Sequence, residues 1–142
     1  MGTVIRKGYM LKYQLKSGKI VEFNLASIDK ALALYRAIIL ECKSVGLDIT
    51  MESETTIAEV LTKNIKAILG IMGSEYVMEA IKDCCDKVLY DKQKFSMDIF
   101  EDERARGDFF GLMLLVAVEN LRPFFAEMTS LFDLILSGVL KA

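Results

Sequence analysis

Residues 109–140 read FFGLMLLVAVENLRPFFAEMTSLFDLILSGVL, and their only charged residues are Glu119, Arg122, Glu127 and Asp133. At about 100° per residue of a continuous helix, these four side chains fall within about 140° of arc. The remaining arc of roughly 220° is apolar, whereas a surface helix presents an apolar stripe of about 100° upward. The segment is therefore either the buried centre of a small domain or a surface reserved for another subunit.

Length and composition indicate one folded domain spanning 1–142. The 142 residues are 53% hydrophobic and 27% charged, which excludes a disordered chain and allows about two-thirds of the unfolded surface to be buried. The longest apolar run, 109–118, is shorter than the roughly 18 residues that a membrane span needs. Residues 1–15 alternate apolar and charged side chains, unlike a signal or transit peptide. The odd number of cysteines predicts no disulfide framework and a reducing cytoplasm.

The net charge of −2 conceals an asymmetry along the chain. Residues 1–21 contain five basic residues and no acidic one, so they carry +5, and the remainder carries 13 − 20 = −7. Each part suits an oppositely charged partner, including another copy of the chain. We expect no direct binding to nucleic acid, because the acidic remainder opposes a phosphate backbone.

The N-terminal part has the pattern of a β-hairpin, at about 8–25. Apolar residues alternate on both sides of the glycine-containing turn Lys16–Lys19, which is a hairpin signal. Tyr13 and Phe23 share alternating positions with leucine and valine, so we expect them on a packed face and the lysines on the solvated one.

The rest of the chain, about 28–140, has helical periodicity. We expect helices at about 28–45, 54–69 and 74–89, a polar connection at 90–97, a helical segment at 98–106 and the apolar C-terminal region. In the first helix, the predicted apolar face carries Ile28, Leu32, Tyr35, Ile39 and Cys42. Pro123 must either kink one long helix or begin a new one, and a kink is favoured because Arg122 is a poor N-cap. The predicted fold class is α+β, mostly α: a hairpin followed by a bundle of four to six helices.

Residues for catalysis are sparse. The chain has no histidine, which removes the commonest general base and metal ligand. The Cys84-Cys85 pair lacks metal-site spacing and is interpreted as two buried apolar residues. Asp98 and Glu101 are spaced to share a divalent ion on one helix, but acidic residues are also favoured at a helix N-terminus. We therefore predict no enzyme activity, no cofactor and no metal.

Adjacent phenylalanines in the C-terminal region indicate a contact surface. Neighbouring side chains on a helix point about 100° apart, so both members of such a pair rarely enter one core. Exposed members then serve as interface anchors. The predicted partner-binding residues are Phe109, Phe110, Met113, Leu114, Phe124, Phe125, Met128, Leu131 and Phe132.

In layout, the chain resembles the small tail assembly chaperones of long-tailed bacteriophages. The resemblance covers Gly8–Leu25 as the hairpin and Ile28–Leu140 as the helical body, and no signature motif carries it. It implies a non-enzymatic protein of the bacterial host cytoplasm that forms homo-oligomers. It also implies a client, a long helical tape-measure-type protein whose apolar segments are shielded during tail assembly.

Two alternatives remain open. A cytoplasmic adaptor or regulatory module would use the same apolar face in a defined heterocomplex. A metal-dependent phosphate hydrolase would need the carboxylates of 98–103 to face others across a cleft.

Overall fold

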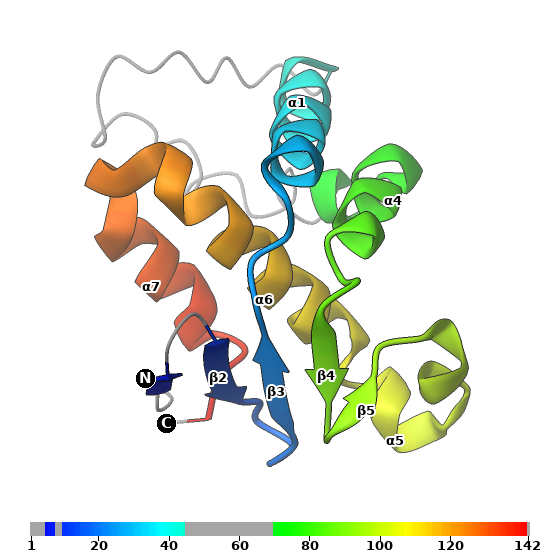
Figure 1. The fold of residues 1–142 in the computed structure, drawn as a ribbon. Helices are drawn as coiled ribbons and strands as arrows, with labels where there is room; N and C mark the ends of the chain where they lie inside the picture. The colour runs from blue at the N-terminus through cyan, green and yellow to red at the C-terminus, as the bar shows by residue number, and fades with distance from the viewer. Residues whose placement is uncertain (1–4, 8–9, 45–69, 142) are drawn as a thin grey trace.

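The computed structural model describes residues 5–7, 10–44 and 70–141, without the side chains of 5–7, 126–128 and 131 (Figure 1). It confirms the predicted fold class, an α+β fold that is mostly helical. None of the helices in these ranges is long and apolar enough to span a bilayer. The helix expected at about 54–69 lies outside the described residues.

The described strands form one antiparallel sheet in the order β1-β2-β3-β4-β5. The strands are β1 (Ile5–Lys7), β2 (Met10–Gln14), β3 (Ile20–Phe23), β4 (Val88–Tyr90) and β5 (Gln93–Lys94). The predicted hairpin is confirmed as β2 and β3, with Leu11 opposite Phe23 and Lys12 opposite Glu22. The hairpin is therefore the centre of a larger sheet, as the marginal stability of two isolated strands requires.

The predictions of a helix at 74–89 and of a polar connection at 90–97 are wrong in part, because Val88–Tyr90 and Gln93–Lys94 form the strands β4 and β5. The helix α4 (Glu75–Asp83) begins at Ser74, whose side chain accepts a hydrogen bond from the Val77 N–H, and it ends six residues before Leu89. The chain then forms β4 and turns back through Asp91 and Lys92, whose φ angles are 49° and 68°. Two positive φ angles in a two-residue loop define a type I′ hairpin turn.

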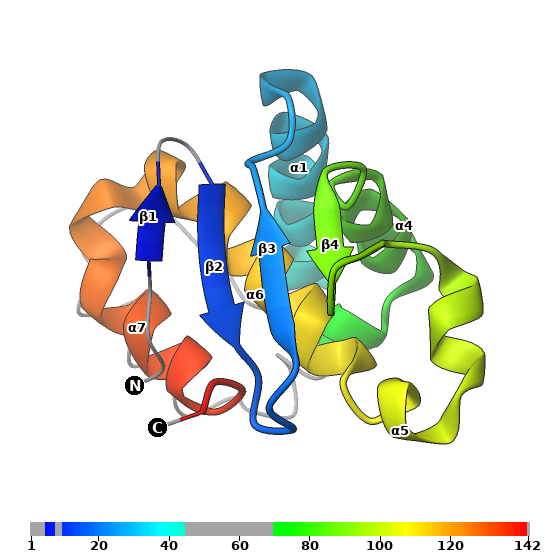
Figure 2. The same ribbon diagram turned by 60° about the horizontal axis from the view of Figure 1, so that its bottom comes forward.

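Figures 1 and 2 show α6 running behind the strands, with α7 beside it and α5 next to the β5 edge of the sheet. The helical elements other than α4 are α1 (Ile28–Ser44), the 3₁₀ helix η1 (Met97–Glu101), α5 (Glu103–Arg106), α6 (Phe109–Leu121), the 3₁₀ helix η2 (Arg122–Met128) and α7 (Thr129–Ser137). The predicted segment 98–106 is thus divided between η1 and α5, because Asp102 is extended and caps α5 through the Ala105 N–H.

The helix α6 forms the centre of the core. Every residue from Leu115 to Leu121 is buried, together with Leu112 and Met113. The inner face of the sheet packs on this core through alternate residues such as Tyr13 and Phe23, which are 3% and 0% exposed and have stacked rings. Of the two interpretations of the apolar C-terminal region, the buried centre is therefore correct for α6.

The region around Pro123 differs from the predicted kink in one long helix. The helix α6 ends at Leu121, and η2 follows with a non-helical residue, Phe125, at φ −133° and ψ 53°. Proline is favoured at the start of a helical segment, because an N–H at that position would have no acceptor within the helix. The chain consequently reverses, and Figure 1 shows α7 returning alongside α6.

The C-terminus completes the edge of the sheet beside β2. Leu140 forms a β-bridge with Leu15, and the Lys141 N–H donates to the Gln14 carbonyl over 3.0 Å. Since β1 pairs with Met10–Lys12, the two ends of the chain cover successive parts of the same edge. The backbone groups of β2 on this side are therefore paired and are not free to bind a strand of another molecule.

Candidate functional site

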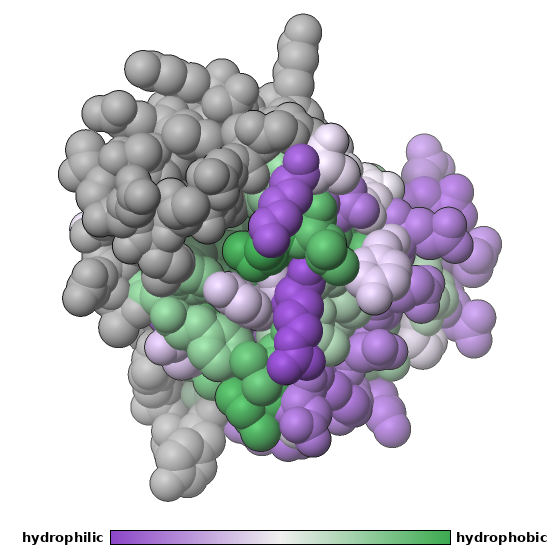
Figure 3. All heavy atoms as spheres, turned by 90° about the horizontal axis from the view of Figure 1, so that it is seen from above, coloured by the Kyte–Doolittle hydropathy of each residue, from purple (hydrophilic) through white to green (hydrophobic). Residues whose placement is uncertain are grey.

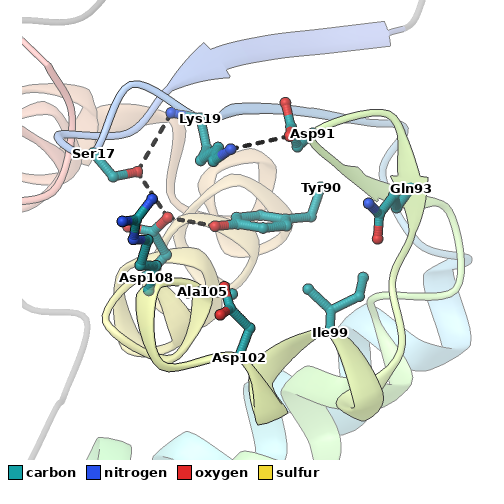
Figure 4. A pocket seen from close by; sticks show the side chains of 10 residues that line it. Ser17, Lys19, Tyr90, Asp91, Gln93, Ile99, Asp102, Ala105 and Asp108 are labelled. Atoms are coloured by element: carbon teal, nitrogen blue, oxygen red, sulfur yellow. Dashed lines mark hydrogen bonds and ion pairs between the residues drawn. The ribbon is translucent and has the colours of Figure 1, made fainter.

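A cleft lies where the β2–β3 turn meets the β4–β5 hairpin and the short helices (Figure 4). Its volume is about 740 Å³, a size typical of small-molecule sites. The residues that line it are Ser17, Lys19, Tyr90, Asp91, Gln93, Ile99, Asp102, Arg104, Ala105 and Asp108.

Asp108, just before α6, receives two hydroxyl donors in this cleft. The Tyr90 hydroxyl donates to Oδ2 over 2.5 Å and the Ser17 hydroxyl donates to the same oxygen over 2.7 Å. Burial raises the pKa of Tyr90, and the hydrogen bond to Asp108 raises it further. The phenol is therefore a neutral donor at physiological pH, and the arrangement ties α6 to the sheet.

The other two carboxylates of the cleft are also engaged. Asp91 forms an ion pair with Lys19, in which Lys19 Nζ lies 3.2 Å from Asp91 Oδ2, and both side chains are about half exposed. Asp102 accepts from the Ala105 N–H over 3.3 Å as the N-cap of α5. Each carboxylate of the cleft therefore binds at least one donor of the protein, and Asp108 binds two hydroxyl groups.

The acidic cluster of 98–103 does not assemble a metal site within the described ranges. Glu101 pairs with Arg106 over 3.4 Å, and Asp102 is the cap just described. No group of three or more carboxylate or cysteine side chains in 10–44 or 70–141 is arranged to hold a metal ion.

The vicinal cysteines follow α4 and are buried, with Cys84 0% and Cys85 2% exposed. Burial raises the pKa of the Cys84 thiol to about 11 and raises that of Cys85 as well. The Cys84 thiol donates to the Lys30 carbonyl over 3.6 Å. The interpretation as buried apolar residues is confirmed, and thiols that stay protonated are poor nucleophiles.

The predicted partner-binding residues on α6 divide between core and surface. Met113 is 0% exposed and lies in the core, whereas Phe109 and Leu114 are half-buried against it. Phe110 is 63% exposed. The 100° argument therefore holds for the pair Phe109–Phe110, in which one ring packs inward and the next faces solvent.

The second pair behaves differently. Phe124 and Phe125 are both half-buried and both contact Tyr35 of α1, with ring centroids 6.0 and 5.7 Å from it. The non-helical backbone at Phe125 brings both rings toward the same neighbour. Phe132 is 7% exposed and belongs to the core, and the side chains of Met128 and Leu131 lie outside the described residues.

Phe110 is supported by a connected set of aromatic rings. Its ring meets Phe109 edge to face at 5.5 Å between centroids, Phe109 meets Phe100 at 5.1 Å, and Phe100 meets Tyr90 at 5.5 Å. Phe95 also contacts Phe100, at 5.7 Å. Phe110 is thus the exposed end of a connected set of rings that reaches the core.

Sequence reasoning missed several exposed apolar side chains. The largest exposed fractions are those of Tyr76 at 65%, Leu134 at 62%, Ile28 at 61% and Leu40 at 57%. Figure 3, which views the α1 and α4 end from above, shows apolar side chains interspersed with charged ones where the surface is coloured. For Tyr76, helical spacing relative to buried Val77 and Ile81 was the signal that could have placed it outward.

Comparisons with protein-family models, with curated proteins and with solved structures found no match for this chain.

Proposed function

We propose that the protein is a non-enzymatic, cytoplasmic assembly chaperone of the phage tail type. It self-associates and shields the apolar segments of a long helical client, such as a tape-measure-type protein. An unassembled client of this kind exposes apolar faces that aggregate, and an amphipathic helix docks by placing its apolar face against such anchors.

The observation that carries this proposal is the exposure of Phe110. Its ring is 63% exposed although its neighbour Phe109 packs on the core. It stands at the outer end of the aromatic set described above. Aromatic side chains, phenylalanine among them, are enriched in the interfaces between proteins.

The arrangement of the carboxylates supports holding over metal-dependent hydrolysis. No group of three or more carboxylate or cysteine side chains within 10–44 or 70–141 is arranged to hold a metal ion. A hydrolase with a metal centre would bind magnesium or manganese at millimolar concentration, and calorimetric titration tests for that heat.

An adaptor that binds one defined partner is the second candidate. The observation in its favour is that the chain buries most of α6 by itself, which leaves a smaller apolar surface than a coat of many copies needs. Sedimentation distinguishes the two, because an adaptor without its partner stays monomeric at high concentration.

A holding assay tests the proposed function directly. The probe is a synthetic leucine-heptad peptide that aggregates in buffer, and the readout is light scattering with and without the full chain. We expect the protein to suppress aggregation and Phe110→Ser to lose most of that suppression. Leu134→Ser is the matched control, because Leu134 is 62% exposed but lies on α7 and outside the aromatic set.

Two results contradict the proposal. One is a wild-type protein that leaves the scattering of the peptide unchanged. The other is a Phe110→Ser variant that protects the peptide as well as the wild type does.

A further inference from the structure

One face of the sheet is not covered by any described helix. Figure 2 looks onto this face, with α1, α4, α6 and α7 behind the strands and α5 to one side of them. Strand alternation and register assign it the residues that are out of phase with the core. We call it the open sheet face: Met10, Lys12, Gln14, Ile20, Glu22, Leu89 and Lys94.

The open sheet face combines apolar and basic side chains. Met10, Ile20 and Leu89 are half-buried, and Lys12 and Lys94 are exposed. Neither lysine forms an ion pair with a carboxylate of the described residues. The β2–β3 and β4–β5 turns next to this face add exposed Lys16 and Lys92. With these residues the lysines exceed the single carboxylate, Glu22, and the face is basic.

The outer face of α4 has the opposite character. Glu75, Tyr76, Glu79 and Asp83 are exposed, and helical geometry places them within about 100° of arc. Val77 and Ile81 on the opposite side of the helix are buried. Among the described residues, Glu79 is the only one of these three carboxylates that forms an ion pair, with Lys82 at 2.6 Å. The outer face of α4 is thus an acidic stripe beside an aromatic ring that is 65% exposed.

We propose that copies of the chain associate head to tail, with the outer face of α4 of one copy on the open sheet face of the next. Tyr76 covers the apolar residues Ile20 and Leu89, while Glu75 and Asp83 approach Lys94 and Lys12. Within one chain the two faces cannot meet, because α4 lies on the covered side of the sheet (Figures 1 and 2).

A contact between two different faces repeats from copy to copy. It forms a ring if the rotation closes and an open helical array if it does not. A nine-residue helix on a small sheet buries an area at the low end for specific interfaces, so each contact is weak. Its exposed charges are screened by salt, which makes salt sensitivity its signature.

The inference rests on the self-association in the proposed function but uses a surface separate from Phe110. The two are therefore tested apart: Phe110→Ser is expected to lose peptide holding and keep self-association. A Tyr76→Ser variant is expected to do the reverse. Loss of both activities in either variant would contradict the separation.

Charge exchange between the two faces provides the decisive experiment. The full chain is studied by sedimentation velocity at low and high sodium chloride, with circular dichroism to verify folding. We expect concentration-dependent association that weakens at least tenfold at high salt. Lys12→Glu/Lys94→Glu and Glu75→Lys/Asp83→Lys should each be monomeric alone, because each places like charges on both faces.

An equimolar mixture of the two variants should associate again, since each then offers the face that the other lacks. Lys43→Glu/Lys87→Glu, which changes the net charge as much as Lys12→Glu/Lys94→Glu at exposed sites outside both faces, should associate like the wild type. Association that survives either reversal, or a mixture that remains monomeric, would overturn the proposal. A wild-type chain that is monomeric at every concentration and salt level would overturn it as well.

Discussion

The side chain of Asn120, near the end of α6, holds the backbone of Ala26, 94 residues away in the sequence. Its Oδ1 accepts from the Ala26 N–H over 2.9 Å, and its Nδ2 donates to the Val116 carbonyl over 2.9 Å. Asn120 is 2% exposed. This buried amide fixes the connection from β3 to α1 on the central helix.

Replacing Asn120 by alanine should therefore destabilise the fold. The Ala26 N–H would lose its partner, and a backbone donor left unsatisfied costs about 1–3 kcal/mol. Urea denaturation gives the change in unfolding free energy, and amide exchange should accelerate at Ala26. Asn24→Ala is the control, because Asn24 is half-buried in the same connection and should cost less. Equal losses for the two variants would refute the role of Asn120.

A buried charge pair joins α6 and α7 where the chain reverses its direction. Arg122 binds Glu119 with Nε at 3.1 Å and Nη2 at 2.9 Å from Oε1, and its Nη2 lies 3.1 Å from Asp133. Burial by itself lowers the pKa of Arg122, but the two carboxylates outweigh it and the net shift is upward. Glu119 is 2% exposed, so Arg122 takes the place of water as the partner of this carboxylate.

Arg122→Met should thus cost about 3–5 kcal/mol at neutral pH, because it leaves a buried carboxylate unpaired. Urea denaturation at pH 7 measures this loss, and adding Glu119→Gln should recover much of it.

A half-exposed pair serves as the comparison for Arg122. Lys19→Met breaks the pair with Asp91, whose side chains are 49% and 48% exposed, and should cost at most about 1 kcal/mol. An Arg122→Met variant no less stable than Lys19→Met would mean that Glu119 is solvated.

The elements that the sequence predicted well are those with local signals. The alternation around Lys16–Lys19 identified the β2–β3 pair, and Ser74 marked the start of α4. In α1, however, Ile28 was placed on the apolar face and is 61% exposed, while Ala31, Leu34 and Ala37 are buried. The helix carries apolar residues on most of its sides, so periodicity alone does not determine which side faces the core.

Long-range pairing explains the larger errors. Val88–Tyr90 continues the helical pattern of α4, and its strand conformation depends on β3, which lies more than 60 residues earlier. The turn at Asp91 and Lys92 lacks the glycine or asparagine that marks type I′ turns. The predicted contact surface agrees with the exposure of Phe110 and is wrong for Met113 and Phe132, which lie in the core. Their burial depends on how the sheet and α7 pack against α6, and local sequence does not show that packing.

Tyr90→Phe should change how stability depends on pH. The pKa of Tyr90 is raised in the folded state, by burial first and then by Asp108. A raised folded pKa gives stability that is complete below the unfolded value, about 10, and is lost as pH rises above it. The wild type should therefore lose stability at alkaline pH by up to about 1.4 kcal/mol per pH unit more than the variant.

At neutral pH the wild type should be the more stable of the two, because Tyr90→Phe removes a hydrogen bond to a carboxylate, worth about 1.5–3 kcal/mol. Denaturation curves at pH 7 and between pH 9 and 11 provide both comparisons. Tyr76→Phe, at a 65% exposed tyrosine, should change neither. Parallel pH profiles for the wild type and Tyr90→Phe would show that the phenol is solvated.

Lys92→Gly should stabilise the protein even though it removes a side chain. Lys92 has φ 68° in the β4–β5 turn, a left-handed conformation that costs a residue with a Cβ about 1–2 kcal/mol and costs glycine almost nothing. The resulting Asp-Gly pair is a preferred type I′ sequence. We expect a gain of about 1 kcal/mol by urea denaturation, since glycine also has more freedom in the unfolded chain. Lys87→Gly, at an exposed residue without a positive φ, should instead lose up to about 1 kcal/mol. A loss for both variants would show that the turn does not hold Lys92 in this conformation in solution.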